Sequence, residues 1–172
     1  MDINSYNVND SVTVLENSGG LEKTGCTLIG WNTLTDGTGV TYSAGDSFIF
    51  TQSTTLYALW VPITQVPYSG SPAGIPGIIE VEEYDLGGDG VAYNDTSNGN
   101  SGGDFRTDNV DIKATADIGG GYNVGWMSSG EWLEYTVDVE SSGAYDLDLR
   151  VASDSGTGSL QISFSGVDKT GS

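Results

Sequence analysis

Residues 131–139 read EWLEYTVDV, and this stretch decides the class of the fold. Trp, Tyr, Thr and Val favour strands, and the run follows a Gly- and Ser-rich segment of the kind that marks turns. We therefore expect a strand over residues 132–139. The same pattern predicts further strands, at residues 11–15, 47–51, 55–60, 145–151 and 160–164.

The rest of the sequence contains no comparable signal for helices. No stretch of helical length places apolar residues at i, i+3, i+4 and i+7 between capping signals. Charged residues make up only 17% of the chain and 26 residues are glycine, a composition typical of short strands joined by turns. The sequence predicts an essentially all-β protein.

One segment separates two halves of different composition. All 4 prolines fall within VPITQVPYSGSPAGIPG, residues 61–77, which has no charged residue. Proline cannot donate to a strand ladder, so a semi-extended linker is expected here. We predict an N-terminal domain at 1–61, a linker at 62–77 and a C-terminal domain at 78–172.

Charge and residue types exclude several functions. A net charge of −19 repels nucleic acid and anionic membrane surfaces, and no run approaches the roughly 20 apolar residues of a membrane span. With 0 histidines and a lone cysteine, Cys26, neither a Ser–His nor a Cys–His pair can form. We expect no nucleic-acid partner, no membrane insertion and no enzymatic activity.

The N-terminal half carries an ordered set of turn and strand motifs: GWNT at 30–33, DGTG at 36–39 and TLYALW at 55–60. This series resembles the Listeria–Bacteroides repeat, a small β-grasp-like module. The resemblance implies an extracellular spacer or adhesive repeat whose aromatic residues form its core. Family members usually begin with a strand that would precede Met1, so that strand is expected to be missing.

Two acidic residues near the start of the C-terminal half, Glu80 and Glu82, stand two positions apart. On a strand, both side chains would point to one face, where they repel each other unless a cation lies between them. Ca²⁺ accepts such carboxylates in loose geometry. The alternative is a solvated strand edge that binds nothing.

Four stretches of the C-terminal half resemble carbohydrate-binding module family 6. They are IPGIIEVEEYD at 75–85, GGDGVAYNDTSNGNSGGDFRTDNVDI at 87–112, GYNVGWMSSGEWLEYTVDV at 121–139 and AYDLDLRVAS at 144–153. The resemblance covers about residues 75–172. It implies a jelly-roll β-sandwich, a structural Ca²⁺ held by Glu80 and Glu82, and a polysaccharide or oligosaccharide ligand.

The family resemblance also implies where the sugar binds. The first aromatic ring of the family's cleft aligns with Trp126, which follows a Gly-rich loop and is expected to be exposed. An aromatic plane suits the apolar face of a pyranose. We expect Tyr93, Asp95 and Glu131 at the rim of this cleft, and Trp132 in the core because it alternates along the strand.

The leading hypothesis is a secreted or cell-surface module that binds a plant or algal wall polysaccharide such as xylan, β-glucan or agarose without altering it. The chain ends before the strands that normally complete the sandwich, so the sandwich is expected to be incomplete. Its open strand edges could pair with a second copy and give a homo-oligomer. The alternative function is a structural or adhesive surface repeat, or a self-assembling fragment, without a working sugar site.

Overall fold

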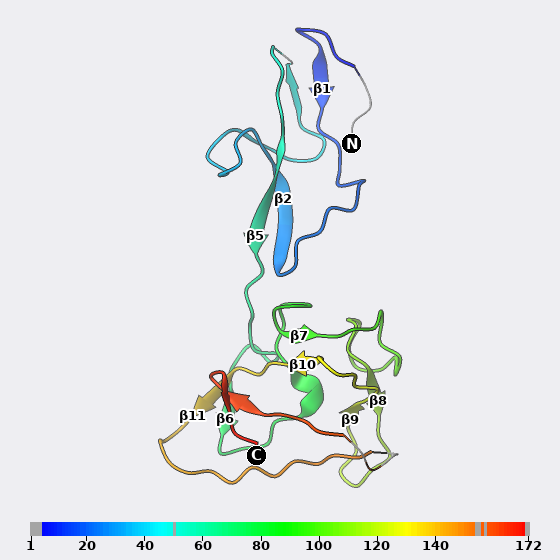
Figure 1. The fold of residues 1–172 in the computed structure, drawn as a ribbon, viewed down its shortest axis with the longest axis vertical. Coiled ribbons are helices and arrows are strands. Elements are labelled where there is room, and N and C mark those ends of the chain that lie inside the picture. The colour runs from blue at the N-terminus through cyan, green and yellow to red at the C-terminus, as the bar shows by residue number, and fades with distance from the viewer. Residues whose placement is uncertain (1–4, 50, 154–155, 157, 171–172) are drawn as a thin grey trace. The chain divides into compact units, whose positions relative to one another are not determined.

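A computed structural model describes residues 5–49, 51–153, 156 and 158–170 (Figure 1). The strands are β1 Ser11–Thr13, β2 Cys26–Asn32, β3 Thr41–Tyr42, β4 Ser47–Ile49, β5 Tyr57–Pro62, β6 Ala73–Ile75, β7 Tyr93–Asn94, β8 Ile112–Ala114, β9 Tyr122–Val124, β10 Trp132–Leu133, β11 Val137–Val139, β12 Ser163–Phe164 and β13 Val167–Asp168. A single 3₁₀ turn, η1 Val81–Glu83, is the only helical element of the described residues. The prediction of an all-β protein is confirmed.

The strands pair in small sheets of two or three, and the molecule divides into two compact units, residues 1–140 and 141–172. No helix in the described part of the chain is long and apolar enough to cross a membrane. The predicted division at residues 62–77 stays a prediction. Part of that segment is β6, which pairs in parallel with β11.

The N-terminal part is built around β2, which pairs with β3 on one side and β5 on the other. Figure 1 shows β2 and β5 side by side. A bulge between Leu28 and Gly30 interrupts the register with β5. The strands β1 and β4 form a separate antiparallel pair. Val12 and Val14 are buried, whereas the aromatic residues that we expected to form the core are half-buried or exposed: Trp31, Tyr42, Phe48, Tyr57 and Trp60.

The loop after β2 is organised by one buried amide. Asn32 is 1% exposed, and its Nδ2 donates to the carbonyl oxygens of Gly37 and Gly39 and to the hydroxyl of Thr41. Its Oδ1 accepts from the amides of Leu34 and Gly39. The asparagine of the GWNT motif therefore fixes the conformation of residues 33–41.

Within residues 78–140, the core consists of four buried side chains, Tyr84, Tyr93, Val110 and Ile112. Burial raises the pKa of the Tyr84 hydroxyl far above its ordinary value, helped by its hydrogen bond of 2.6 Å to Asp108. Arg106 lies over the Tyr84 ring, 3.6 Å from its centroid, and pairs with Asp108. This cation–π and ionic cluster anchors the segment between β7 and β8 to the core.

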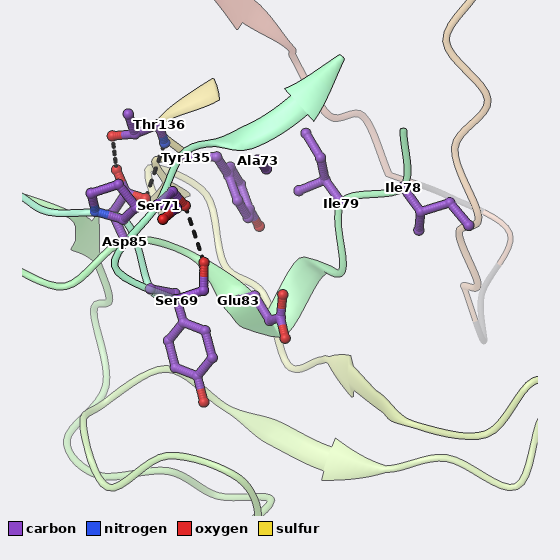
Figure 2. Close-up of a pocket in the computed structure, with 11 residues that line it drawn as sticks. Ser69, Ser71, Ala73, Ile78, Ile79, Glu83, Asp85, Tyr135 and Thr136 are labelled. Carbon is purple, nitrogen blue, oxygen red and sulfur yellow. Dashed lines mark hydrogen bonds between the residues drawn. The ribbon is translucent and has the colours of Figure 1, made fainter. Parts of the chain in front are cut away.

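A buried carboxylate ties the segment before β6 to this core. Asp85 is 2% exposed and accepts hydrogen bonds from the Gln65 side chain and from the amide and hydroxyl of Thr136. Figure 2 shows Asp85 and Thr136 together at one edge of a pocket that Ile78, Ile79 and other residues line. Gln65 and β6, both within residues 62–77, thus bond to residues that follow them in the chain.

The second unit, residues 141–172, contains the antiparallel pair β12–β13. The strand predicted at 145–151 is not formed, although its side chains alternate between apolar and polar. The side chains of Tyr145, Leu147, Leu149 and Val151 are exposed. An isolated strand leaves its backbone groups unpaired, so the alternation alone does not suffice to form it.

Candidate functional site

The loop that joins β9 to β10, residues 125–131, presents the tryptophan that the sequence singled out. Trp126 is 60% exposed, and its neighbour Met127 is also exposed. The backbone of Trp126 has a φ of 51°, in the left-handed region that bulky residues rarely adopt. The prediction that this ring is exposed is confirmed, and its contact with a sugar stays a prediction.

Hydrogen bonds fix both ends of this loop. At its start, the Gly125 amide donates to the carbonyl of Asp111 at 2.9 Å. At its end, the Asn94 side chain donates to the carbonyl of Gly130 at 3.0 Å, and β10 pairs with β7. The loop is therefore held against two segments distant in sequence.

Glu131 links the loop to the segment after β7. Its Oε1 accepts hydrogen bonds from the amide of Thr96 at 3.1 Å and from the Thr96 hydroxyl at 2.6 Å. Its Oε2 accepts from the amide of Ser128 at 2.6 Å. Partial burial raises the pKa of Glu131, but these hydrogen bonds outweigh burial and leave the pKa below its ordinary value of 4.5. The carboxylate is thus held in its charged form.

Asp95 lies in the same segment and is half-buried. Its Oδ1 accepts from the amide and hydroxyl of Ser97, which closes a local turn, and its own amide donates to Asp89. Because Glu131 bonds to the next residue, Thr96, the structure brings Asp95 and Glu131 into neighbouring segments. Their contact with a ligand stays a prediction.

Tyr93 is a correction to the expected site. Its side chain is 4% exposed and packs edge-on against Tyr84 with the ring centroids 5.5 Å apart, so it belongs to the core rather than to a cleft rim. Burial raises the pKa of its hydroxyl. The physical reason is the pairing of Tyr93 with Leu133, which turns both side chains toward the core.

Trp132 also differs from the prediction, because it was expected in the core and is exposed. It pairs with Asn94 and is 37% exposed, whereas the next residue, Leu133, packs against the core. Adjacent residues on a strand point to opposite faces, so burying Leu133 exposes Trp132. This part of the chain therefore presents two exposed tryptophans, Trp126 and Trp132.

The two acidic residues proposed for calcium do not share a strand face. Glu80 precedes the 3₁₀ turn η1 and is exposed, whereas Glu82 lies within the turn and is 5% exposed. Residues two apart point in different directions in a 3₁₀ turn, whose period is three. The expectation that both carboxylates lie side by side on a strand is wrong.

One carboxylate oxygen of Glu82, Oε2, is buried and accepts no hydrogen bond within the described structure. Burial raises the pKa of the nearby Tyr135, and the charge of Glu82 raises it further. Ca²⁺ takes 6–8 oxygen ligands, and no group of three or more His, Cys, Asp or Glu side chains gathers for a metal among the residues that can be described. An ion at Glu82 would need carbonyl or water oxygens as well.

Sequence reasoning missed two residues of this region, Thr96 and Ser128, which are the partners of Glu131. They stand 35 and 3 positions from Glu131. The separation of Thr96 left no pattern in the sequence that could have indicated the pairing.

Two family models match the chain. Residues 2–59 match the Listeria-Bacteroides repeat domain, and residues 104–171 match the carbohydrate binding module of family 6. The resemblance stated from the sequence is confirmed in identity and in order. Trp126 and Glu131 fall within the second match, while Glu80, Glu82, Tyr93 and Asp95 precede it. The family match supports carbohydrate binding.

A curated relative is similar over most of the chain. The clotting factor G alpha subunit of Tachypleus tridentatus is 27% identical over 169 residues, which cover 94% of this chain and 21% of the relative. The chain thus spans only a small part of that relative's length.

Proposed function

We propose that this chain, a Listeria–Bacteroides repeat followed by a family 6 carbohydrate-binding segment, binds a polysaccharide without altering it chemically. The observation that carries the proposal is the exposed indole of Trp126 on a loop within the segment that matches the family. We propose xylan, β-glucan and agarose as the candidate ligands, and a secreted or cell-surface location, since both matched modules are typically extracellular.

The geometry of the loop supports this role. An exposed indole offers a flat apolar surface to the C–H face of a pyranose, whose hydroxyls require fixed polar partners nearby. Polar groups of Asp95 and Thr96 lie in the segment to which Glu131 ties the Trp126 loop. An exposed ring on a loop that is tied to a segment with fixed polar groups supports recognition of a sugar.

The decisive test compares Trp126→Ala with Met127→Ala on soluble xylan, mixed-linkage β-glucan and agarose oligosaccharides. Both residues are exposed neighbours on one loop, so both variants remove apolar surface at the same place. Loss of a central aromatic contact costs about 2 kcal/mol or more, which is at least about a thirtyfold loss of affinity. Equal affinities of the two variants, or no binding by the parent chain, would contradict the proposal.

We also propose that Ca²⁺ stabilises this part of the chain through Glu82, with Glu80 as a second ligand. A bound cation would neutralise the buried carboxylate whose Oε2 has no partner among the described groups. Chelation with EDTA should then lower the melting temperature, because a ligand that favours the folded state stabilises it. Glu82→Gln should abolish this calcium dependence, whereas a shift that survives in this variant would place the ion elsewhere.

A second candidate function is self-association as a structural or adhesive unit. The exposed alternation of Tyr145, Leu147, Leu149 and Val151 favours it, because an exposed apolar segment with this alternation can add as a strand to another chain. Light scattering across a concentration series tests this candidate: dimers that Leu147→Lys disrupts would support it. A monomer at all concentrations would contradict it and leave sugar binding as the function.

A further inference from the structure

We propose that Glu131 is a positioning residue that holds the Trp126 loop in its sugar-binding conformation, rather than a ligand of the sugar. The inference rests on the proposed function, in which Trp126 contacts the polysaccharide. In this role Glu131 holds the loop in place and does not line the rim of the site, where the sequence predicted it.

The contacts of the carboxylate carry the proposal. Glu131 accepts three hydrogen bonds, two from Thr96 and one from the Ser128 amide. A carboxylate offers about four acceptor positions, so most of its capacity is spent within the protein. The bond from the Thr96 hydroxyl is 2.6 Å long, within the range of charge-assisted O–H···O⁻ bonds, and the bond from the Ser128 amide is also short, at 2.6 Å.

The position of Ser128 explains why this matters for Trp126. Along the loop, the Gly125 amide bonds to Asp111, and the next amide with a bonding partner in the described structure is that of Ser128. Trp126 lies between these two points, with a backbone φ of 51°. A residue in this region needs its surroundings to keep it there. The nearest restraints on the C-terminal side of Trp126 are both between Ser128 and Glu131: the Ser128 amide donates to the Glu131 carboxylate, and the Glu131 amide donates to the Ser128 carbonyl at 3.2 Å.

Thr96 provides the fixed end of this support. It lies two residues after β7, which pairs with β10 and packs through Tyr93 into the core. Glu131 therefore links a segment anchored to the core to the loop that bears Trp126. A second bond, from Asn94 to the Gly130 carbonyl, acts in parallel on the same side of the loop. Loss of the carboxylate would leave the Ser128 amide without its acceptor, while the bond from Asn94 and the bond from the Glu131 amide to the Ser128 carbonyl remain.

The experiment uses Glu131→Gln in the full chain, with Glu134→Gln as the matched control. Glu134 is exposed and lies three positions along the same segment, so the control removes one surface charge without the loop bonds. Three measurements are made on each variant: affinity for soluble xylan, mixed-linkage β-glucan and agarose oligosaccharides, melting temperature, and amide exchange at Ser128 and Thr96. We expect Glu131→Gln to lower affinity about tenfold and to speed exchange at both amides.

Double variants separate a positioning role from direct contact with the sugar. In a Trp126→Ala background, Glu131→Gln should cause little further loss of affinity, because Glu131 acts through Trp126. Thr96→Ser, which keeps the hydroxyl donor, should retain the affinity that Thr96→Val loses. An equal loss of affinity with and without Trp126 would overturn the proposal and make Glu131 a sugar ligand.

Failure of the proposed function gives a different pattern. If Trp126→Ala leaves binding to all three probes unchanged, the proposed sugar site is wrong, and the amide exchange then decides the role of Glu131 alone. Faster exchange at Ser128 in Glu131→Gln, but not in Glu134→Gln, would still show that Glu131 holds the loop. Unchanged exchange would overturn the positioning role whatever the sugar data show.

Discussion

Replacing Asp85 by alanine should destabilise the residue 1–140 unit by about 3 kcal/mol, because the buried carboxylate accepts hydrogen bonds from three donors. The Thr136 amide and hydroxyl donate to it at 3.0 and 2.5 Å, and the Gln65 side chain donates at 2.7 Å (Figure 2). Each buried donor left without a partner costs about 1–3 kcal/mol. Gln65 is half-buried and can turn to water, so the two Thr136 donors dominate the cost.

Urea unfolding and amide exchange test this value. For a chain of this size, about 3 kcal/mol corresponds to a fall in melting temperature of about 6–12 °C. Asp138→Ala is the control, since Asp138 is exposed on β11, and it should change stability by about 0.5 kcal/mol or less. The Thr136 amide should lose its protection from exchange in Asp85→Ala alone. A loss below about 1 kcal/mol, or equal losses in the two variants, would refute the role of the Asp85 cluster.

Three further outcomes follow from single contacts. Asn32→Ala should cost about 3 kcal/mol in urea unfolding, because the 1% exposed amide makes five hydrogen bonds to residues 34–41. Gly102→Ala should lower the melting temperature by several degrees, since a Cβ there would lie 1.9 Å from the Ile112 carbonyl oxygen. Affinity for the sugar probes should hold from neutral pH down to about 4.5 and fall at lower pH as Glu131 gains a proton. The folded pKa of Glu131 is depressed. Its contribution is therefore complete above the unfolded pKa of 4.5 and is lost as pH falls through the folded pKa. A matching pH profile in Glu131→Gln would contradict the last expectation, since that variant has no carboxylate at position 131 to gain a proton.

The sequence indicated the strand positions well where a partner strand exists. Segments at 11–15, 47–51 and 55–60 correspond to β1, β4 and β5, and the run at 132–139 forms β10 and β11 with a break between them. The segment at 145–151 has equally strong alternation and forms no strand. Alternation reports which face of a strand can be buried, whereas a strand also requires a neighbour for its backbone.

The site was predicted less completely, because burial depends on contacts distant in sequence. The exposure of Trp126 could be anticipated from its place after a Gly-rich segment. The burial of Tyr93 could not, since it depends on which residue of β10 lies opposite. Glu82 became buried, and separated from Glu80, because a 3₁₀ turn replaces the expected strand.

The backbone of Trp126 offers a way to tell a binding role from a structural one. At a φ of 51° a side chain with a Cβ is strained by about 1–2 kcal/mol, a cost that glycine avoids. At an ordinary loop position alanine is more stable than glycine by about 0.4–1 kcal/mol. At position 126 we expect the reverse, with Trp126→Gly more stable than Trp126→Ala by about 1 kcal/mol in urea unfolding, although both variants lose sugar affinity. If Trp126→Gly is also at least as stable as the parent while it loses affinity, the residue is kept for its exposed ring rather than for stability. If instead both variants unfold more easily than the parent by about 2 kcal/mol or more, the indole packs against the protein and does not serve a ligand.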